Sequence, residues 1–544
     1  MYEILITKMK RIRNISFLAL SSALVLVSCG GNNTKKGGGT KKFTSQAGWK
    51  ANDQKGWFFS AKPQKQKGWP NMVYVEGGTF TMGLVKDDVM HDWNNTPRRM
   101  QVSSFFISET ETTNYDYRSY VTWLKYVFPP SDPSFSNIYN GALPDTLVWV
   151  NNLSRNDFSE TYFRSSEYDY YPVVGVSWSQ ASKYCEWLTD RANEKALMEK
   201  GIIDKNLYVN DSNNQGTSSF TLDKYRANDP EMQSYLNMQR AQKATGIKTS
   251  NQRILAANRN ATAGVVEKFR LPTEVEWEFA ALGMQKNREY NMYLGKEPKV
   301  EDLRGEKGRN RGMFLENFKY GRGDYSGPAG WKNDGAAITS DVRQFQSNDL
   351  GIFGMFGNVA EWTADVYRPI IDDEGNDFNY YRGNVVQQKV KNPDGTYKMI
   401  QGTEVKYDTL ANGKIVYRGL PGQYERETVA DYRNFRDGDF MSSLEAGYGR
   451  EVDSTSADFS MYNSPKKRFR VDEHGRVIME KDRSVRTSEI SDEVRVVKGG
   501  SWKDTAYWLD PGQRRFKNEG KGYGWIGFRV AQDAKSQGKA RSKR

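Results

Sequence analysis

The spacing of apolar and polar positions predicts short strands where the folded body begins. Residues 72–83 (Met-Val-Tyr-Val-Glu-Gly-Gly-Thr-Phe-Thr-Met-Gly) predict two short strands around a Gly-Gly turn. Residues 100–111 predict one further strand. Residues 112–114 (Thr-Thr-Asn) can then cap a helix whose aromatic residues recur at helical spacing through Trp123.

The same kind of pattern predicts two more helices. Residues 172–178 (Pro-Val-Val-Gly-Val-Ser-Trp) lead into a helix expected from Ser179 to about Lys200. Further along the chain, Thr273 can cap a helix whose first turn is acidic, which the helix dipole favours.

Turn signals are frequent in the long segment between about residues 367 and 495. Asn-Gly within residues 410–415 predicts a type I′ hairpin, and residues 392–396 (Asn-Pro-Asp-Gly-Thr) mark another turn. We therefore expect this segment to form hairpins and long loops that lie on the core.

Composition favours a globular, loop-rich protein. Of 544 residues, 37% are hydrophobic and 13% aromatic, which is enough for a sizeable core. We expect irregular structure to outweigh helix. A net charge of +12 would ordinarily suggest nucleic acid as a partner. The N-terminus indicates export instead, and we expect no nucleic-acid partner.

The first 28 residues have the order of a bacterial lipoprotein signal. A basic cluster at residues 10–13 precedes an apolar run over residues 15–27, which is shorter than the roughly 20 residues that span a bilayer. The run ends in Leu-Val-Ser-Cys, the pattern at which signal peptidase II cuts before a diacylated cysteine. We predict a signal peptide over residues 1–28 and a lipid on Cys29. The alternative is a core segment that happens to contain a cysteine.

Residues 29–70 predict a flexible basic tether followed by a Trp-rich lead-in. Because no Asp follows Cys29, we expect the lipid to anchor the protein to the outer membrane, facing the periplasm. Residues 534–544 form a basic tail, which is most simply solvated. The positive charge would suit anionic lipid, a cell-wall polymer such as peptidoglycan, or an acidic partner subunit.

Cysteine and histidine are too scarce for several kinds of site. With Cys29 lipidated, Cys185 has no partner for an internal disulfide. It lies in a predicted helix, where a small buried apolar role is more common than a nucleophilic one. His91 and His474 are the only histidines, so a histidine-based zinc or iron site is excluded.

Five sequence blocks resemble the formylglycine-generating enzyme (sulfatase-modifying factor) family. The blocks are residues 72–83, 270–280, 351–363, 497–502 and 527–530. The resemblance implies an α+β fold with much irregular structure, related to C-type lectins. It also implies one domain over residues 71–533, interrupted by two large insertions at about 193–268 and 367–495.

The residues that carry catalysis in that family are missing. In the family, two cysteines shortly after a Gly-Gly-Ser element bind copper and oxidise a substrate cysteine, and the resemblance places them at Asp504 and Leu509. Soft thiolates select Cu(I), so we expect no copper. Related sulfoxide synthases bind iron through three histidines, more than this chain contains. Ser501 and Trp502 are then best interpreted as a Gly-rich turn that holds a core Trp.

The resemblance also implies two calcium sites made of oxygen ligands, which suit a hard cation. The first maps to two side chains and two carbonyls, those of Asn317, Asp334, Phe318 and Ala336. The second is weaker, because a glycine replaces a ligating Asn, and it maps to Gly354, Gly357, Val359 and Glu361. The alternative for both is a surface turn rich in Asn, Asp and Gly.

Among catalytically degenerate relatives, the chain most resembles the gliding-motility lipoproteins of the Bacteroidetes. This resemblance rests on the lipidation pattern, the aromatic lead-in and residues 351–362, 365–369 and 525–529. It implies a non-enzymatic structural component of gliding motility and type IX protein secretion, whose insertions bind partner subunits. Two alternatives stay open: a formylglycine-generating-type oxidase or other protein-modifying enzyme with a divergent site, and a glycan-binding module.

Overall fold

A computed structural model of the chain describes residues 68–84, 94–150, 156–203, 216–227, 229–230, 236, 266–283, 313–319, 336, 338–369, 383–431, 433, 468–471, 477–480 and 491–534. All of these residues belong to one structural unit, Ala61–Arg544. The predicted signal peptide, Cys29, the tether as far as residue 67 and the tail beyond residue 534 lie outside the described residues.

The described residues form short helices and short strands. The helices are α2 (Asn114–Val127), α3 (Ser136–Ala142), α4 (Phe158–Thr161), α5 (Trp178–Glu199), α7 (Leu222–Ala227) and α11 (Glu274–Leu282), with 3-10 turns at Thr146–Trp149, Ser166–Tyr168, Gly216–Ser218, Gly402–Glu404 and Ala506–Leu509. The strands are β1 (Met72–Val75), β2 (Gly78–Met82), β3 (Arg98–Val102), β4 (Phe105–Ser108), β5 (Phe269–Arg270), β6 (Ala360–Val366), β7 (Val385–Lys389), β8 (Tyr407–Thr409), β9 (Ile415–Tyr417), β10 (Arg426–Asp431), β11 (Arg468–Val471), β12 (Val477–Glu480), β13 (Val494–Lys498), β14 (Arg515–Asn518), β15 (Ile526–Gly527) and β16 (Ala531–Asp533). None of the described helices is both long enough and apolar enough to cross a membrane.

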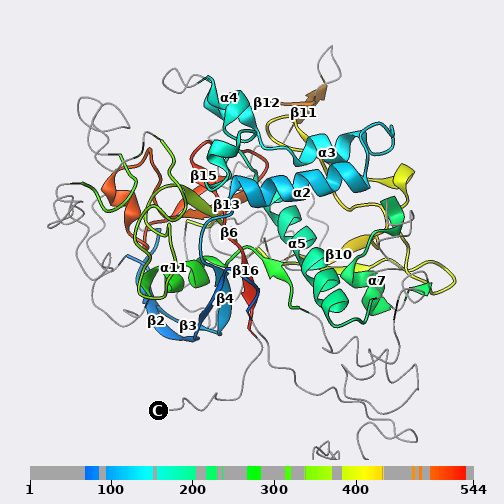
Figure 1. The fold of residues 1–544 in the computed structure, drawn as a ribbon, viewed down its shortest axis with the longest axis horizontal. Helices are drawn as coiled ribbons and strands as arrows, with labels where there is room; N and C mark the ends of the chain where they lie inside the picture. Colours follow the sequence, from blue (N-terminus) through cyan, green and yellow to red (C-terminus); the bar gives the residue numbers. More distant parts are fainter. Residues whose placement is uncertain are drawn as a thin grey trace, which may run out of the picture. The chain divides into compact units, whose positions relative to one another are not determined.

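Two four-stranded sheets join segments that are far apart in the sequence (Figure 1). One has the order β1-β4-β16-β5, so the late strand β16 lies between two early ones and pairs antiparallel with both. The other has the order β14-β13-β6-β15, in which β6 pairs antiparallel with β13 and parallel with β15. Every residue of β6 and β13 is buried, as expected for central strands covered on both faces.

The strands predicted at residues 72–83 form, but they do not pair with each other. β1 pairs with β4, and β2 pairs with β3. The single strand predicted over residues 100–111 is wrong, because β3 and β4 are separate strands in different sheets. The chain changes sheet between them. Such a change depends on distant pairing partners, which local alternation does not encode.

Three helices begin at a capping box, and the predicted caps of α2 and α11 are confirmed. The cap residue and its partner three positions later are Thr113 with Asp116, Ser177 with Gln180, and Thr273 with Glu276. The reciprocal hydrogen bonds satisfy backbone groups that a helix end otherwise leaves unpaired. The long helix α5 begins one residue earlier than predicted and ends at Glu199.

The core contains two main clusters of apolar side chains. The larger packs α2 and α5 against the C-terminal strands, with ring centres of Tyr117 and Tyr184 5.6 Å apart and of Tyr184 and Phe528 5.5 Å apart. The smaller packs α11 against β2 and β3, where Phe80 and Phe279 lie 5.1 Å apart. All of α11 is buried, so this helix forms part of the core.

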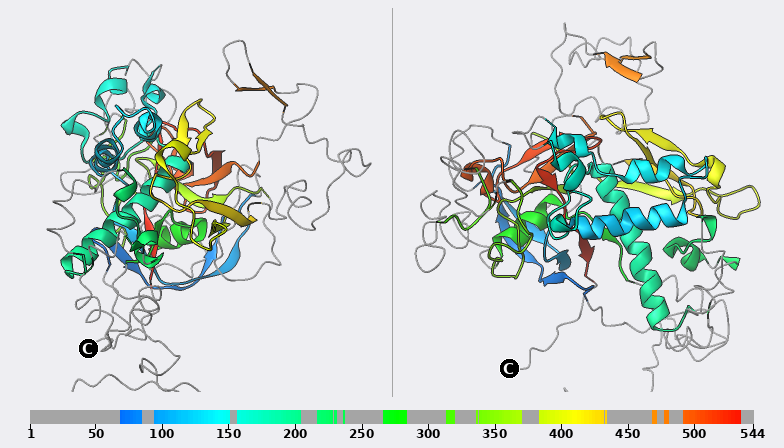
Figure 2. Two further views of the ribbon diagram at one scale, coloured as in Figure 1. Left: turned by 90° about the vertical axis from the view of Figure 1, so that its right-hand side faces the viewer. Right: turned by 45° about the horizontal axis from the view of Figure 1, so that its top comes forward.

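Described segments of the two insertions, residues 216–227 and 385–431, lie against the helices and against each other (Figure 2). In the second insertion β8 pairs with β9 and β7 with β10, and β9 packs on α3. Asp223, on α7 of the first insertion, forms ion pairs with Arg426 and, over 3.4 Å, with Lys389 of the second. These segments therefore lie together beside α3 and α5.

The hairpin predicted at residues 410–415 forms, but its loop is longer than a type I′ turn. A type I′ turn needs positive φ at both central residues, whereas within this described loop only Gly413 has one, at 79°. A 2.7 Å hydrogen bond from the Leu410 N–H to the Lys414 carbonyl closes the loop. The turn at residues 392–396 is confirmed by a 2.7 Å hydrogen bond between its ends.

Candidate functional site

The Gly-Gly-Ser-Trp segment forms a tight turn after β13. Gly499 has a φ of 74°, a conformation that glycine adopts without strain, and it packs against the ring of Trp277. Trp502 is buried and donates from Nε1 to the carbonyl of Gly524 over 3.1 Å. The prediction of a Gly-rich turn that holds a core Trp is confirmed.

The two positions that the resemblance assigns to copper-binding cysteines hold an ion-paired carboxylate and a core leucine. Asp504 accepts a hydrogen bond from the Ser501 hydroxyl and forms an ion pair of 2.8 Å with Arg515. Leu509 is 1% exposed in the smaller core cluster. A Cβ placed on Gly500 would lie 2.6 Å from the Leu509 side chain, so packing here is close. An ion pair and a core leucine do not fit Cu(I), which selects thiolates.

Arg515 fills the space beside Asp504. Its guanidinium carbon lies 4.7 Å from the ring centre of Trp508 and 4.6 Å from that of Trp525, and the group donates to the Gly499 carbonyl over 2.8 Å. Burial lowers the pKa of Arg515, while the Asp504 carboxylate opposes that shift. A guanidinium stays protonated at physiological pH, so a permanent cation lies beside Asp504. Sequence reasoning missed Arg515, because only the folded turn brings it to Asp504.

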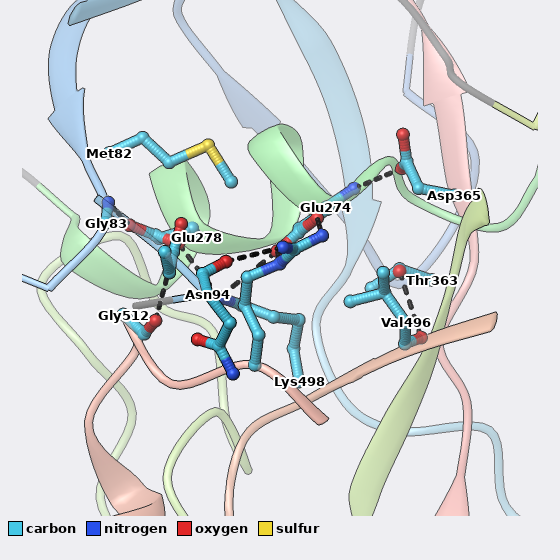
Figure 3. Close-up of polar contacts among 12 residues, drawn as sticks. Met82, Gly83, Asn94, Glu274, Glu278, Thr363, Asp365, Val496, Lys498 and Gly512 are labelled. Atoms are coloured by element: carbon cyan, nitrogen blue, oxygen red, sulfur yellow. Dashed lines mark hydrogen bonds and ion pairs between the residues drawn. The ribbon is translucent and has the colours of Figure 1, made fainter. Parts of the chain in front are cut away.

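Next to the turn, buried charges form a network around Lys498 (Figure 3). Lys498 is fully buried and donates to Glu278 over 2.9 Å, and Glu278 also accepts from the Gly83 N–H over 2.6 Å. Arg514 contacts both oxygens of Glu274, at 2.5 and 3.0 Å. Burial alone would raise the pKa of Glu274, but Arg514 and Lys498 lower it. The two cations neutralise the two carboxylates, Glu274 and Glu278. This pairing lowers the free-energy cost of burying four charges, so we assign the network a structural role.

Glu361, the carboxylate of the second predicted calcium set, is held by protein groups on both oxygens. Arg529 donates to each oxygen over 2.6 Å, and the indole of Trp277 donates to Oε2 over 2.7 Å. Gly354 has a φ of 65°, which favours glycine, and a Cβ there would lie 2.3 Å from the carboxylate of Glu111. This donor set fits calcium poorly, because Arg529 already neutralises its ligating carboxylate.

The remaining members of that set, Gly357 and Val359, flank Asn358 in the turn before β6. Gly357 has a φ of 114°, and a Cβ there would lie 2.4 Å from the Asn317 carbonyl. The same carbonyl accepts a hydrogen bond of 2.9 Å from the Asn358 N–H. The turn is therefore packed directly on the first predicted calcium set.

The first predicted calcium set is only partly described, since Asp334 lies outside the described residues. Asn317 is 2% exposed, and its side-chain nitrogen donates to the Ile338 carbonyl over 2.7 Å. No described residue donates to its side-chain oxygen, which leaves an oxygen ligand for a cation. Phe318 and Ala336 are buried. Across the described residues, no group of three or more His, Cys, Asp or Glu side chains could hold a metal.

The other residues singled out from the sequence lie apart from this turn. Cys185 is a buried free thiol in α5, and burial raises its pKa, in keeping with a small apolar role. His91, His474 and Cys29 lie outside the described residues.

A narrow cleft at the junction of the two insertions was not predicted. It lies between α2, α5, residues 219–221 of the first insertion and residues 417–423 of the second. Glu186, Trp187 and Asp190 line it from α5, and burial raises the pKa of Asp190 to about 7. Its walls come from four separate segments, so no local motif marks it.

The domain family described as sulfatase-modifying factor enzyme 1-like matches residues 58–409, more than half of the chain. The chain belongs to this family. The α+β fold implied by the sequence blocks is therefore confirmed. The fold also continues past residue 409, because β13 to β16 complete both four-stranded sheets.

Relatives in this family include proteins named as enzymes and proteins named as inactive. The chain is 24% identical over 318 residues to the inactive C-alpha-formylglycine-generating enzyme 2 of Bos taurus, covering 56% of this chain and 73% of that protein. It is 22% identical over 312 residues to the formylglycine-generating enzyme of Mus musculus, covering 54% and 58% respectively. Among solved structures, Treponema denticola variable protein 1 aligns with 85% of this chain and 95% of its own, at 15% identity and a TM-score of 0.33.

Proposed function

We propose that this chain is a non-catalytic outer-membrane lipoprotein that acts as a structural component of gliding motility and type IX protein secretion. Within that class we propose a protein like the gliding-motility lipoprotein GldJ, with a GldK-like lipoprotein as the close alternative. The observation that supports a non-catalytic role is the ion pair of Asp504 with Arg515, at a position where the family oxidase needs a thiolate.

Copper-dependent oxidation would need two thiolates close together at the turn after β13. The second position is a close-packed leucine, Leu509. Cys185 is buried in α5 and Cys29 precedes the domain, so neither supplies the missing sulfur. The space beside Asp504 holds Arg515 between two Trp rings. These contacts support a stabilising role for a turn that is catalytic in other members.

The lipid on Cys29 and the tether over residues 29–70 would hold the folded domain near the periplasmic face of the outer membrane. The insertions, about 193–268 and 367–495, would then present partner-binding surfaces. The ion pairs of Asp223 support this role, because they fix the described parts of the two insertions relative to each other. A structural Ca²⁺ at Asn317 would brace the adjoining loop.

The oxidase alternative is tested by incubating the full-length protein with copper and a sulfatase-type cysteine peptide. We expect no formylglycine by mass spectrometry under conditions in which a formylglycine-generating enzyme converts the peptide. Conversion that disappears in Asp504→Ala would overturn the proposal, because it would show a working catalyst at this turn.

The assembly role is tested by crosslinking intact cell envelopes and purifying the protein with its partners. We expect gliding and type IX secretion subunits among the crosslinked proteins, and fewer of them when the Asp223 ion pairs are removed by Asp223→Asn. Recovery of envelope enzymes and sulfatases in their place would point to the protein-modifying alternative.

A further inference from the structure

Beside the degenerate copper position, cations and aromatic rings alternate on one surface. The guanidinium of Arg515 lies between Trp508 and Trp525. The ammonium of Lys503 lies 4.8 Å from the ring centre of the same Trp525. Two cations therefore share one indole, a favourable arrangement for each of them with the ring.

The pattern continues over the adjoining ring. The ring centre of Tyr523 lies 5.9 Å from that of Trp525. The ammonium groups of Lys517 and Lys521 lie 5.8 and 5.6 Å from the Tyr523 ring centre. We call this set the basic–aromatic surface; it comprises Lys503, Trp508, Arg515, Lys517, Lys521, Tyr523 and Trp525.

The charge of this surface is only partly balanced within the protein. Asp504 pairs with Arg515 and accepts from the Ser501 hydroxyl, so its oxygens are engaged. Glu519, which lies in sequence between the two outer lysines, pairs with Arg495 over 2.7 Å.

In the part of the chain that the structure describes, Lys503, Lys517 and Lys521 have ring contacts and no ion-pair partner. Burial lowers the pKa of Lys503; the Asp504 carboxylate opposes that shift, while the nearby Lys517 and Arg515 add to it. Like charges are thus gathered within electrostatic reach of one another, which costs free energy unless an anion is bound.

We propose that the basic–aromatic surface binds an acidic segment of a partner protein. Its carboxylates would pair with Lys503, Lys517 and Lys521 while its apolar atoms lie against the aromatic rings. The biological meaning of this surface rests on the proposed assembly role, but the binding itself does not.

The shape of the surface favours a polypeptide over a lipid bilayer. A protein that binds lipid at the interface inserts protruding Trp, Phe or Leu side chains. Here Trp525 is 8% exposed, and Trp508 and Tyr523 are only partly exposed. Recessed rings between lysines suit separate carboxylates on a flexible chain, which can reach each ammonium in turn.

The experiment measures binding of fluorescent poly-L-glutamate to purified full-length protein by anisotropy, at low and at physiological salt. The test variant carries Lys503→Ala, Lys517→Ala and Lys521→Ala. The control variant carries Lys195→Ala, Lys398→Ala and Lys406→Ala, which removes the same charge from lysines that already pair with Glu199 or Glu425.

We expect the test variant to lose about tenfold or more in affinity, since three charge contacts of ordinary strength add up to that factor. The control variant should bind within about twofold of the native chain, because its three lysines lie outside the basic–aromatic surface; an effect of net charge alone would weaken both variants equally. Substitution of the same three lysines by arginine should retain binding, which separates loss of charge from loss of fold.

Three outcomes would overturn the assignment. They are equal losses in test and control variants, no binding of poly-L-glutamate by the native chain at low salt, and binding of anionic phosphatidylglycerol vesicles in preference to poly-L-glutamate. The last would assign the surface to lipid. None of these outcomes bears on the formylglycine assay or the envelope crosslinking, so this proposal and the proposed function can fail separately.

Discussion

Asp504 is 8% exposed, and the guanidinium of Arg515 compensates its buried charge. Removing one member of such a pair leaves the other charge buried without compensation, which costs about 3 kcal/mol. We therefore expect Arg515→Leu to lower the free energy of unfolding by roughly that amount in a urea titration. The double variant Asp504→Leu with Arg515→Leu removes both charges and should recover most of the loss. Equal losses in the single and double variants would show that the pair does not matter.

Asp190 lines the cleft at the junction of the two insertions, and its carboxyl should make the stability of the protein depend on pH. Burial raises its pKa from 3.8 to about 7, with Arg191 opposing the shift. The folded state therefore holds a proton that the unfolded state releases, so stability is fully present below about pH 4 and is lost as the pH rises to about 7. Asp190→Asn keeps an acceptor for the Leu222 N–H, now bonded over 2.9 Å, and does not titrate.

Melting temperatures of the native chain and Asp190→Asn, taken from pH 4 to pH 8, check this expectation. The two proteins should be similar at the acid end. The variant should be more stable by several kcal/mol at neutral pH, where the native chain has lost the contribution of its protonated Asp190. A constant difference across the range would mean that Asp190 titrates normally.

At the scale of elements, the second insertion packs so closely on α3 that it should reverse the usual effect of a glycine-to-alanine substitution on stability. Gly141 is buried in α3, and a Cβ there would lie 2.2 Å from the Ile415 carbonyl of β9. Glycine to alanine in a helix normally stabilises by roughly 1 kcal/mol. We expect Gly141→Ala to destabilise instead and to make the β8–β9 hairpin more sensitive to protease. Asn140→Ala, at an exposed position of the same helix, serves as the control. Stabilisation by both variants would mean that the hairpin does not pack here.

Capping residues could be predicted because their chemistry is local. Thr273 and Glu276 lie three residues apart, so their reciprocal hydrogen bonds form within one turn of the chain. Sheet membership could not be predicted in the same way. β1 and β2 are separated by two residues yet belong to different sheets, because their partners are distant in sequence. Arg515 could not be predicted for the same reason. The resemblance places Asp504 where other family members have a cysteine, but only the folded turn brings Arg515 to Asp504.

At the scale of the whole molecule, the C-terminal strands belong to the same sheets as the strands that precede the second insertion. β16 pairs with both β4 and β5, and β13 pairs with β6, so residues after the second insertion complete sheets begun before it. An insertion of this kind is tolerated because closing a longer loop adds little entropy cost once its two ends are fixed in a sheet. This explains how the domain can accept long insertions and keep its core.

The first calcium set predicts a ligand-dependent stability of the entire domain. A cation that binds Asn317 only in the folded state would raise the free energy of unfolding. The increase grows with the logarithm of the cation concentration and reaches about 2.7 kcal/mol when that concentration is a hundred times Kd. We expect a chelator to lower the melting temperature and added Ca²⁺ to restore it. Asn317→Ala should melt at a lower temperature whether or not the chelator is present. If the chelator leaves the native melting temperature unchanged, calcium does not bind.

A lipid on Cys29, as predicted from the sequence, would determine where the domain acts. With about 0.8 kcal/mol contributed by each buried methylene, the acyl chains of a lipidated Cys29 would dominate the attachment to the membrane. Cys29→Ala removes the acceptor, and we expect the protein to leave the outer-membrane fraction when envelopes are separated on a density gradient. Ser28→Ala keeps the lipidation pattern and should remain in that fraction. If Cys29→Ala also stays with the outer membrane after a high-salt wash, protein contacts retain it, and the basic–aromatic surface becomes the first region to test for those contacts.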